Sequence, residues 1–163
     1  CHVQAYLNMY DVTRGLRENG TFLLNTVWSG EELAKHLPNK VKRYFAQNNI
    51  TVYYMNATKI ARELGLGNRT NSVLQAAFFV LMEVIPKEQA LELIKEATRK
   101  TFFAKGDDVV ARNVAAIDAG AAGVVEVEIL FFPGCLGCNR CIFLRHNRLH
   151  SPYSLIVLAQ AGS

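Results

Sequence analysis

Three short runs rich in β-branched and aromatic residues alternate with segments of helical pattern, and this alternation limits the possible folds more than any other feature. The first two runs are residues 20–25 (GTFLLN) and 49–56 (NITVYYMN). In the third, residues 123–129 (GVVEVEI), glutamates alternate with valine or isoleucine. Runs of this composition are typical of β-strands. We therefore expect the three runs to form strands of one sheet.

Helix signals fill the sequence between these runs. Ser29 and Glu32 have the spacing of a capping box. Asn56 is placed to cap a helix that ends at Gly65. Further helices are predicted over residues 39–49, 70–84, 87–102 and 107–121. An order in which strands and helices alternate indicates a layered α/β/α domain whose sheet is mixed or largely parallel.

One predicted helix, residues 70–84, is apolar on nearly every face. Such a helix is expected to be buried. Two groups of aromatic side chains are likewise expected to lie in the core rather than to stack on nucleic-acid bases. These groups are Tyr44, Phe45, Tyr53 and Tyr54, and Phe78 with Phe79.

Length and charge limit the class of protein. At 163 residues and 50% hydrophobic, the chain is long enough for one domain with a proper core. The net charge is +4, but Arg140, Arg145 and Arg148 all follow the last acidic residue, Glu128. Residues 1–130 therefore hold 15 basic residues against 14 acidic ones. A nucleic-acid surface needs a concentrated basic field, so we do not expect the main body to bind nucleic acid.

No membrane or secretion signal is predicted. The chain begins at Cys1 without a methionine, a charged leader or an apolar core. Its longest apolar stretches, residues 76–82 and 154–159, are far shorter than the roughly 20 residues that a membrane-spanning helix needs. The four cysteines lie at positions 1, 135, 138 and 141, which is not the spread of a secreted disulfide framework. These features favour a reducing, cytoplasmic location.

The body of the chain contains no self-contained active-site motif. A dinucleotide G-x-G-x-x-G after a strand, a Walker A loop, a G-x-S-x-G elbow and an H-E-x-x-H helix do not occur in the sequence. Residues 105–108 (KGDD) do not match the Gly-Asp-Gly segment of a thiamine diphosphate site. His2 and His36 are interpreted as surface or packing residues.

A glycine-containing loop is the best candidate for a ligand site. Residues 63–75 (ELGLGNRTNSVLQ) join two predicted helices through two glycines. Free amides and the positive end of the helix dipole would face an anion there, and an arginine guanidinium would donate bidentate hydrogen bonds to it. The candidate contacts are Gly67, Asn68, Arg69 and Asn71.

A simpler interpretation of the same loop is favoured. The glycines would end one helix, Asn68 or Thr70 would cap the next, and Arg69 would pair with a carboxylate. Phosphate loops usually follow a strand, whereas this loop follows a predicted helix.

The C-terminal segment carries a candidate metal site. Cys135, Cys138 and Cys141 have the rhythm of a [4Fe–4S] ligand run, although the expected fourth cysteine and proline do not follow. Alternatively, Cys138, Cys141, His146 and His150 have nearly the spacing of a zinc knuckle, which could contact single-stranded RNA. We favour no metal, because nothing else in the sequence indicates a metal module.

The order of several short motifs identifies a family resemblance. These motifs are GTFLLN, W-S with E-E-L, H-L-P, K-R-Y, G-L-G-N-R and Q-A-A-F-F. In this order they closely resemble the gamma domain of pyruvate:ferredoxin (flavodoxin) oxidoreductases. The resemblance covers residues 1–130, while residues 131–163 form an unmatched tail. The gamma domain normally begins upstream with a glycine-rich strand-turn-helix that this chain lacks, which implies a sheet that is incomplete at the N-terminus.

The resemblance implies the function. Such enzymes of anaerobic metabolism convert pyruvate to acetyl-coenzyme A on thiamine diphosphate with Mg²⁺, and pass electrons through [4Fe–4S] clusters to ferredoxin or flavodoxin. It implies that these cofactors are held by other domains or subunits of a homodimeric parent, in the cytoplasm or in a hydrogenosome or mitochondrion-related organelle. The loop at Gly67 to Asn71 would then contact coenzyme A phosphates. The alternative is a degenerate α/β binding module whose zinc-knuckle tail contacts RNA.

Overall fold

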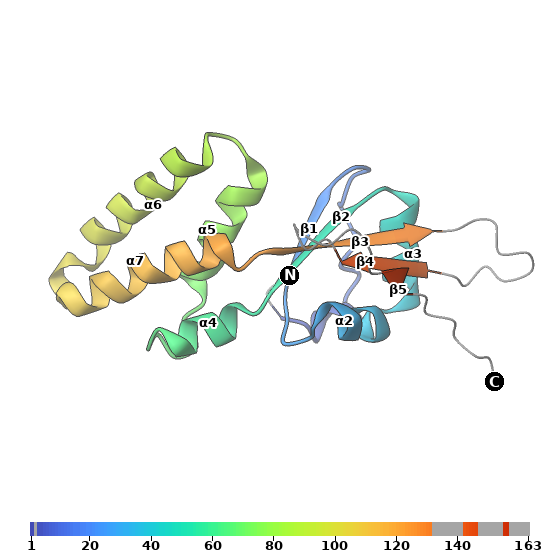
Figure 1. The fold of residues 1–163 in the computed structure, drawn as a ribbon, viewed down its shortest axis with the longest axis horizontal. Coiled ribbons are helices and arrows are strands. Elements are labelled where there is room, and N and C mark those ends of the chain that lie inside the picture. The colour runs from blue at the N-terminus through green and yellow to red at the C-terminus, as the bar shows by residue number, and fades with distance from the viewer. Residues whose placement is uncertain (2, 132–141, 147–154, 157–163) are drawn as a thin grey trace, which may run out of the picture. The chain divides into compact units, whose positions relative to one another are not determined.

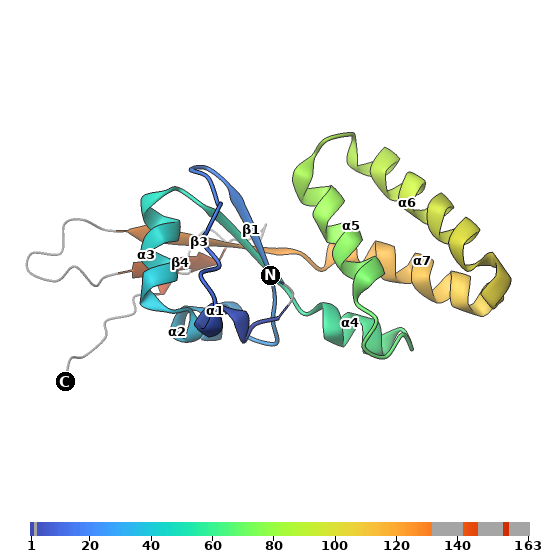
Figure 2. The same cartoon turned by 180° about the vertical axis from the view of Figure 1, so that it is seen from behind.

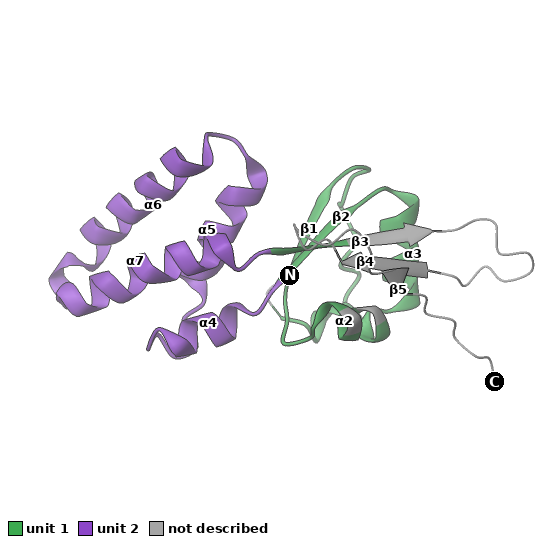
Figure 3. Ribbon diagram, viewed as in Figure 1, with its two compact units in different colours: residues 1–54, 125–163 green, residues 55–124 purple. Residues whose placement is uncertain are grey.

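A computed structural model describes residues 1, 3–131, 142–146 and 155–156 of the chain (Figure 1). The chain divides into two compact units, which Figure 3 distinguishes by colour. Residues 1–54 and 125–163 form unit 1, and residues 55–124 form unit 2. None of the helices in the described ranges is both long and apolar enough to cross a membrane.

Unit 1 contains a five-stranded sheet in the order β1-β2-β3-β4-β5. Its strands are β1 (Thr21–Asn25), β2 (Thr51–Met55, whose last residue belongs to unit 2), β3 (Val125–Phe131), β4 (Ile142–His146) and β5 (Leu155–Ile156). The three runs expected to form one sheet correspond to β1, β2 and β3, so this prediction is confirmed. The α/β fold class is confirmed as well.

The sheet combines two kinds of strand pairing. The Thr51 amide donates to the Gly20 carbonyl at 2.9 Å, which places the starts of β1 and β2 together, as parallel strands require. Strand β2 pairs with β3 antiparallel, with Tyr54 opposite Val125. Strands β3 and β4, and β4 and β5, are also antiparallel. Of the two arrangements predicted, mixed and largely parallel, the sheet has the mixed one.

Three helices accompany the sheet in unit 1. They are α1 (Tyr6–Met9), α2 (Gly30–His36) and α3 (Asn39–Gln47). The predicted capping box begins α2, because the Ser29 hydroxyl accepts from the Glu32 amide and the Glu32 carboxylate accepts from the Ser29 amide. Figure 2 shows α3 lying against one face of the sheet. The core joins these elements through Phe22, Leu24, Leu33, Phe45, Val52 and Val127.

Unit 2 is helical. Its elements are α4 (Ala57–Glu63), α5 (Asn71–Met82), α6 (Lys87–Phe102), a short 3₁₀ turn (Phe103–Lys105) and α7 (Asp107–Ala122). Helices α5, α6 and α7 meet around Ala76, Ile94 and Ile117. Gly120 of α7 lies against the backbone of α5, where a Cβ atom would be 2.9 Å from the Cα of Val73. The missing side chain therefore allows a close approach of α5 and α7.

The prediction that the helix over residues 70–84 is buried is wrong for one of its faces. Val73, Ala76 and Ala77 are fully buried, but Phe78 is 51% exposed and Met82 is 48% exposed. Within unit 2 the neighbouring helices cover only the side of α5 that carries the small residues. Of the aromatic groups expected in the core, Phe45 is fully buried, whereas Phe78 is not. Tyr44, Tyr53 and Tyr54 are half-buried.

The predicted division of the chain at residue 130 stays a prediction. The boundary falls within β3, and most of residues 131–163 lie outside the described residues.

Candidate functional site

The loop between α4 and α5 has a defined backbone path. Gly65 and Gly67 both have positive φ, at 71° and 61°, a conformation that glycine adopts readily. Between them, Leu66 is buried, and its amide donates to the Ala61 carbonyl at 2.8 Å. At the other end of α4, the Asn56 side chain accepts from the Lys59 amide as predicted. The loop is thus anchored by one apolar side chain between two left-handed glycines.

The four candidate anion contacts lie together at the start of α5. Gly67, Asn68, Arg69 and Asn71 are all exposed. The Asn68 side-chain oxygen accepts two hydrogen bonds from the guanidinium of Arg62, at 3.3 and 3.1 Å. This leaves the Asn68 amide nitrogen as a donor. The Arg69 guanidinium forms no ion pair with any residue that the structure describes.

The N-terminus of α5 has no side-chain cap. Thr70 is the N-cap residue, but its side chain makes no capping hydrogen bond, and the first turn contains no acidic residue. Asn68 contacts Arg62 rather than the helix end. The simpler interpretation of the loop, with a cap from Asn68 or Thr70 and a carboxylate partner for Arg69, therefore differs from the described geometry. The first amides of α5 remain without intrahelical partners, and the helix dipole makes this end positive.

Two further arginines border the loop, and neither was predicted from the sequence. Arg62 comes from α4, and Arg112 comes from α7. A Cβ atom at Gly65 would lie 3.3 Å from a terminal nitrogen of Arg112, so the glycine lies next to that guanidinium. Arg112 also pairs with Asp108 at 2.5 Å. Periodicity identifies the helix faces, but it does not tell which residue of α7 reaches a loop more than 40 positions earlier.

The predicted metal ligands are not tested by the structure. Cys135, Cys138, Cys141 and His150 lie outside the described residues. His146 lies in β4, where its backbone is opposite Val127, and nothing is described of its side chain. In the part of the chain that is described, no three His, Cys, Asp or Glu side chains are grouped so that they could hold a metal ion.

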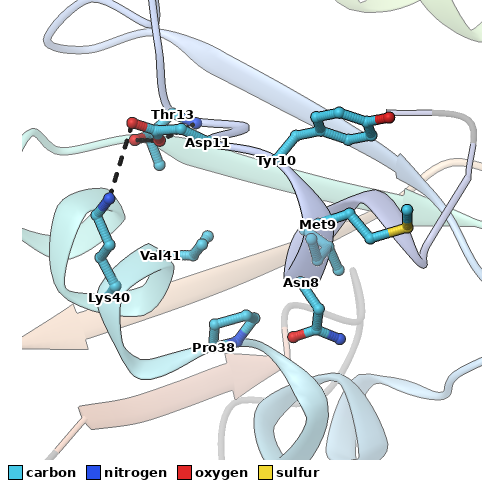
Figure 4. A pocket seen from close by; sticks show the side chains of 9 residues that line it. Asn8, Met9, Tyr10, Asp11, Thr13, Pro38, Lys40 and Val41 are labelled. Atoms are coloured by element: carbon cyan, nitrogen blue, oxygen red, sulfur yellow. Dashed lines mark hydrogen bonds and ion pairs between the residues drawn. The ribbon is translucent and has the colours of Figure 1, made fainter.

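A hollow of about 290 Å³ lies in unit 1 between α1 and the start of α3 (Figure 4). The carboxylate of Asp11 lies at its edge and accepts from the amide and hydroxyl of Thr13, at 3.2 and 2.6 Å. These hydrogen bonds lower the pKa of Asp11. The Lys40 ammonium approaches the other Asp11 oxygen at 3.8 Å. The remaining lining residues are Leu7, Asn8, Met9, Tyr10, Pro38 and Val41.

A second hollow, of about 390 Å³, lies on the exposed side of α3. It shares Lys40 with the first hollow, and its other lining residues are Asn39, Arg43, Tyr44 and Gln47. The Tyr44 hydroxyl donates to the Leu16 carbonyl at 2.6 Å, which fixes the ring. Neither hollow was predictable from the sequence, because both are lined largely by exposed residues of ordinary composition.

Comparisons with known proteins give consistent results. The family described as pyruvate ferredoxin/flavodoxin oxidoreductase matches residues 1–123. The pyruvate-flavodoxin oxidoreductase of Klebsiella pneumoniae is 46% identical over 129 residues, which are 79% of this chain and 11% of that protein. The pyruvate:ferredoxin oxidoreductase of Moorella thermoacetica is 39% identical over 128 residues, which are 78% of this chain and 11% of that protein. The chain thus spans about a tenth of the length of these curated relatives.

A solved structure is similar over part of the fold. The crystal structure of pyruvate oxidoreductase subunit PORC from Thermotoga maritima matches with a TM-score of 0.53 and 26% sequence identity. The match covers 69% of this chain and 55% of that subunit.

Proposed function

We propose that this chain, which belongs to the pyruvate ferredoxin/flavodoxin oxidoreductase family, is one segment of an enzyme that oxidises pyruvate. The observation that carries this proposal is the 46% identity over 129 residues with a pyruvate-flavodoxin oxidoreductase. Because the chain spans only 11% of that relative, the complete activity belongs to a larger assembly. This segment contributes structure and, through the loop before α5, part of a binding surface.

The parent reaction is the oxidative decarboxylation of pyruvate to acetyl-coenzyme A, with electrons passed to ferredoxin or flavodoxin. Thiamine diphosphate with Mg²⁺ and [4Fe–4S] clusters, when bound, supply carbanion stabilisation and electron transfer. The described residues do not fit the metal groups, since none of them form a cluster of three potential ligands. We derive no step through those groups on this chain, and we propose that other domains or subunits of a homodimeric parent hold them.

We also propose a location for the parent enzyme. Bacterial relatives such as that of Klebsiella pneumoniae support a cytoplasmic parent enzyme. The relative from Euglena gracilis is named a mitochondrial pyruvate dehydrogenase, which supports a mitochondrion-related organelle as the alternative.

The loop before α5 is proposed to contact the phosphates of coenzyme A. Arg69 has an unpaired guanidinium among the described residues, and Arg62 orients Asn68 so that its amide nitrogen remains a donor. A Cβ atom at Gly67 would meet nothing within 4 Å, so an anion can approach the backbone there. Asn71 opens α5, whose first amides carry no side-chain cap. A phosphate satisfies such donors directly.

A chimeric enzyme tests the family function. The 129-residue matching region of the Klebsiella pneumoniae enzyme is replaced by the corresponding residues of this chain, and pyruvate-dependent reduction of flavodoxin is measured. We expect the chimera to assemble and to turn over pyruvate in the presence of coenzyme A. A chimera that folds and binds its cofactors but shows no pyruvate oxidation would contradict the proposal.

Two arginine substitutions in the same chimera test the loop. Arg69→Gln removes a charge-assisted hydrogen bond, worth about 1.5–3 kcal/mol when fully formed and less at an exposed position. We expect the KM for coenzyme A to rise about tenfold, while the KM for pyruvate stays unchanged. Arg99→Gln, at an exposed position in the last turn of α6, is the matched control. Equal KM values for coenzyme A in both variants would contradict the proposed contact between the loop and coenzyme A, but not the proposed family function.

The RNA-binding alternative gains no support. It depends on Cys138, Cys141 and His150, which lie outside the described residues, and on His146, whose side chain is not described. The names of the relatives are those of pyruvate oxidoreductases.

A further inference from the structure

Helix α3 begins with a charge distribution that its own dipole disfavours. Lys40 lies in its first turn and Arg43 one turn later, and the first turn contains no acidic residue. The N-terminal end of a helix is positive and normally attracts acidic side chains. Local rules of this kind are broken most often where a surface serves a function. The arrangement therefore raises the question of what negative charge the N-terminal half of α3 meets.

Asp11 supplies only part of that charge. Its contact with the Lys40 ammonium is 3.8 Å long, beyond hydrogen-bond range, and 80% of the Lys40 side chain is exposed. Thr13 occupies the other Asp11 oxygen. Arg43 forms no ion pair with a described residue. The face of α3 thus presents an ammonium group that is loosely held and a guanidinium group that is free.

The two hollows of unit 1 have Lys40 as a common lining residue and differ in chemistry. The hollow on the exposed face of α3 is lined by donors, since Asn39 and Gln47 add side-chain amides to Lys40 and Arg43. The hollow towards α1 has an apolar floor of Leu7 and Val41, with Pro38 beside it. Figure 4 shows Lys40 and Val41 together on the α3 side of this hollow.

The volumes limit the size of an occupant. At about 290 and 390 Å³, each hollow is near the lower end of the roughly 300–1,000 Å³ that ligand pockets span. The pair therefore suits a small molecule with a charged head and a compact apolar body.

We propose that these two hollows together bind a small organic oxyanion. Its carboxylate or phosphate head lies between Lys40 and Arg43, where the guanidinium offers two parallel donors. Its apolar body lies over Pro38 and Val41. The Asp11 carboxylate repels a second negative charge from the apolar hollow, so the ligand enters in one orientation. This site lies within unit 1 and is independent of the loop before α5.

Titrations followed by amide chemical shifts of the full chain test the proposal. The probes are benzoate and phenyl phosphate, with benzamide as the uncharged analogue and acetate as the head without a body. We expect at least one of the two aromatic anions to shift the amides of α3 at millimolar concentration in low salt, at least fivefold more tightly than either control. We expect added salt to weaken this binding.

Variants separate a site from a general charge effect. Arg43→Gln is expected to weaken the binding about tenfold. Arg43→Lys keeps the positive charge but cannot donate bidentate hydrogen bonds, so it is expected to weaken the binding about threefold. The matched control, Arg99→Gln in unit 2, is expected to leave it unchanged. Equal binding of benzamide or acetate, no shift with either aromatic anion, or equal effects of Arg43→Gln and Arg99→Gln would overturn the proposal.

Discussion

Substituting Gly120 by alanine tests how closely α5 and α7 pack in unit 2. The added Cβ would lie 2.9 Å from the Cα of Val73 and still closer to its carbonyl oxygen. Both atoms belong to the backbone, so a rotation of a side chain cannot relieve the contact. Helix α7 must instead move away from α5, which opens the packing around Ala76 and Ile117.

The expected cost combines two opposing effects. Overpacking of a close-packed interior destabilises a protein by about 1–3 kcal/mol. Alanine in a helix interior is favoured over glycine by roughly 0.5–1 kcal/mol. Because α7 must shift as a backbone segment, we expect the steric effect to prevail and the free energy of unfolding to fall by about 1–2 kcal/mol. This corresponds to a decrease in Tm of roughly 2–8 °C.

Urea unfolding followed by circular dichroism measures this change. Ala111→Gly, at an exposed position of the same helix, is the matched control, since it changes helix propensity without changing the α5–α7 contact. We expect it to cost about 0.5–1 kcal/mol, less than Gly120→Ala. If Gly120→Ala is as stable as the unaltered chain or more stable, the close approach of the two helices is wrong.

Three smaller predictions concern hydrogen bonds of helix residues. Ser29→Ala removes the side-chain cap of α2 and should lower the free energy of unfolding by about 1 kcal/mol in urea titrations, whereas Ser29→Thr should retain most of it. The hydrogen bonds from Ser29 lower the pKa of Glu32. The stabilisation by the Glu32 carboxylate is therefore present above the pKa that Glu32 has in the unfolded chain, and it is lost as the pH falls through its pKa in the folded chain. If Glu32→Gln leaves the dependence of stability on acidic pH unchanged, this prediction is wrong. Lys95 of α6 contacts Asp118 of α7 at 2.7 Å, and the hydrogen bond to Asp118 raises the pKa of Lys95. The stabilisation by this ion pair is therefore full below the pKa that Lys95 has in the unfolded chain, and it is lost as the pH rises through its pKa in the folded chain. Asp118→Asn should reduce the loss of stability at alkaline pH, as measured by thermal unfolding.

The elements of the fold were largely predictable because they depend on local chemistry. The strand over residues 51–55 follows from a run of β-branched and aromatic side chains, and the start of α2 follows from the spacing of Ser29 and Glu32. Each of these signals acts within a few residues. The exposed face of α5 was not predictable in the same way, because Phe78 has the same composition signal whether or not another element covers it.

The details of the candidate loop were only partly predictable. The sequence placed Asn68 and Arg69 at the start of a helix, and the structure agrees. The hydrogen bonds from Arg62 to Asn68 and the approach of Arg112 to Gly65 depend on how helices pack. Such contacts between distant positions leave no periodic trace in a single sequence.

The pairing of Tyr54 with Val125 has a consequence for the evolution of the chain. These two residues are neighbours on adjacent antiparallel strands, although the 70 residues of unit 2 separate them in the sequence. In the order of the chain, unit 2 is thus inserted where a hairpin turn would connect β2 to β3. An excursion that leaves and rejoins a sheet at one point can lengthen, shrink or be exchanged without shifting the strand register. Changes in the length of unit 2 would therefore leave the pairing of β2 with β3 in place.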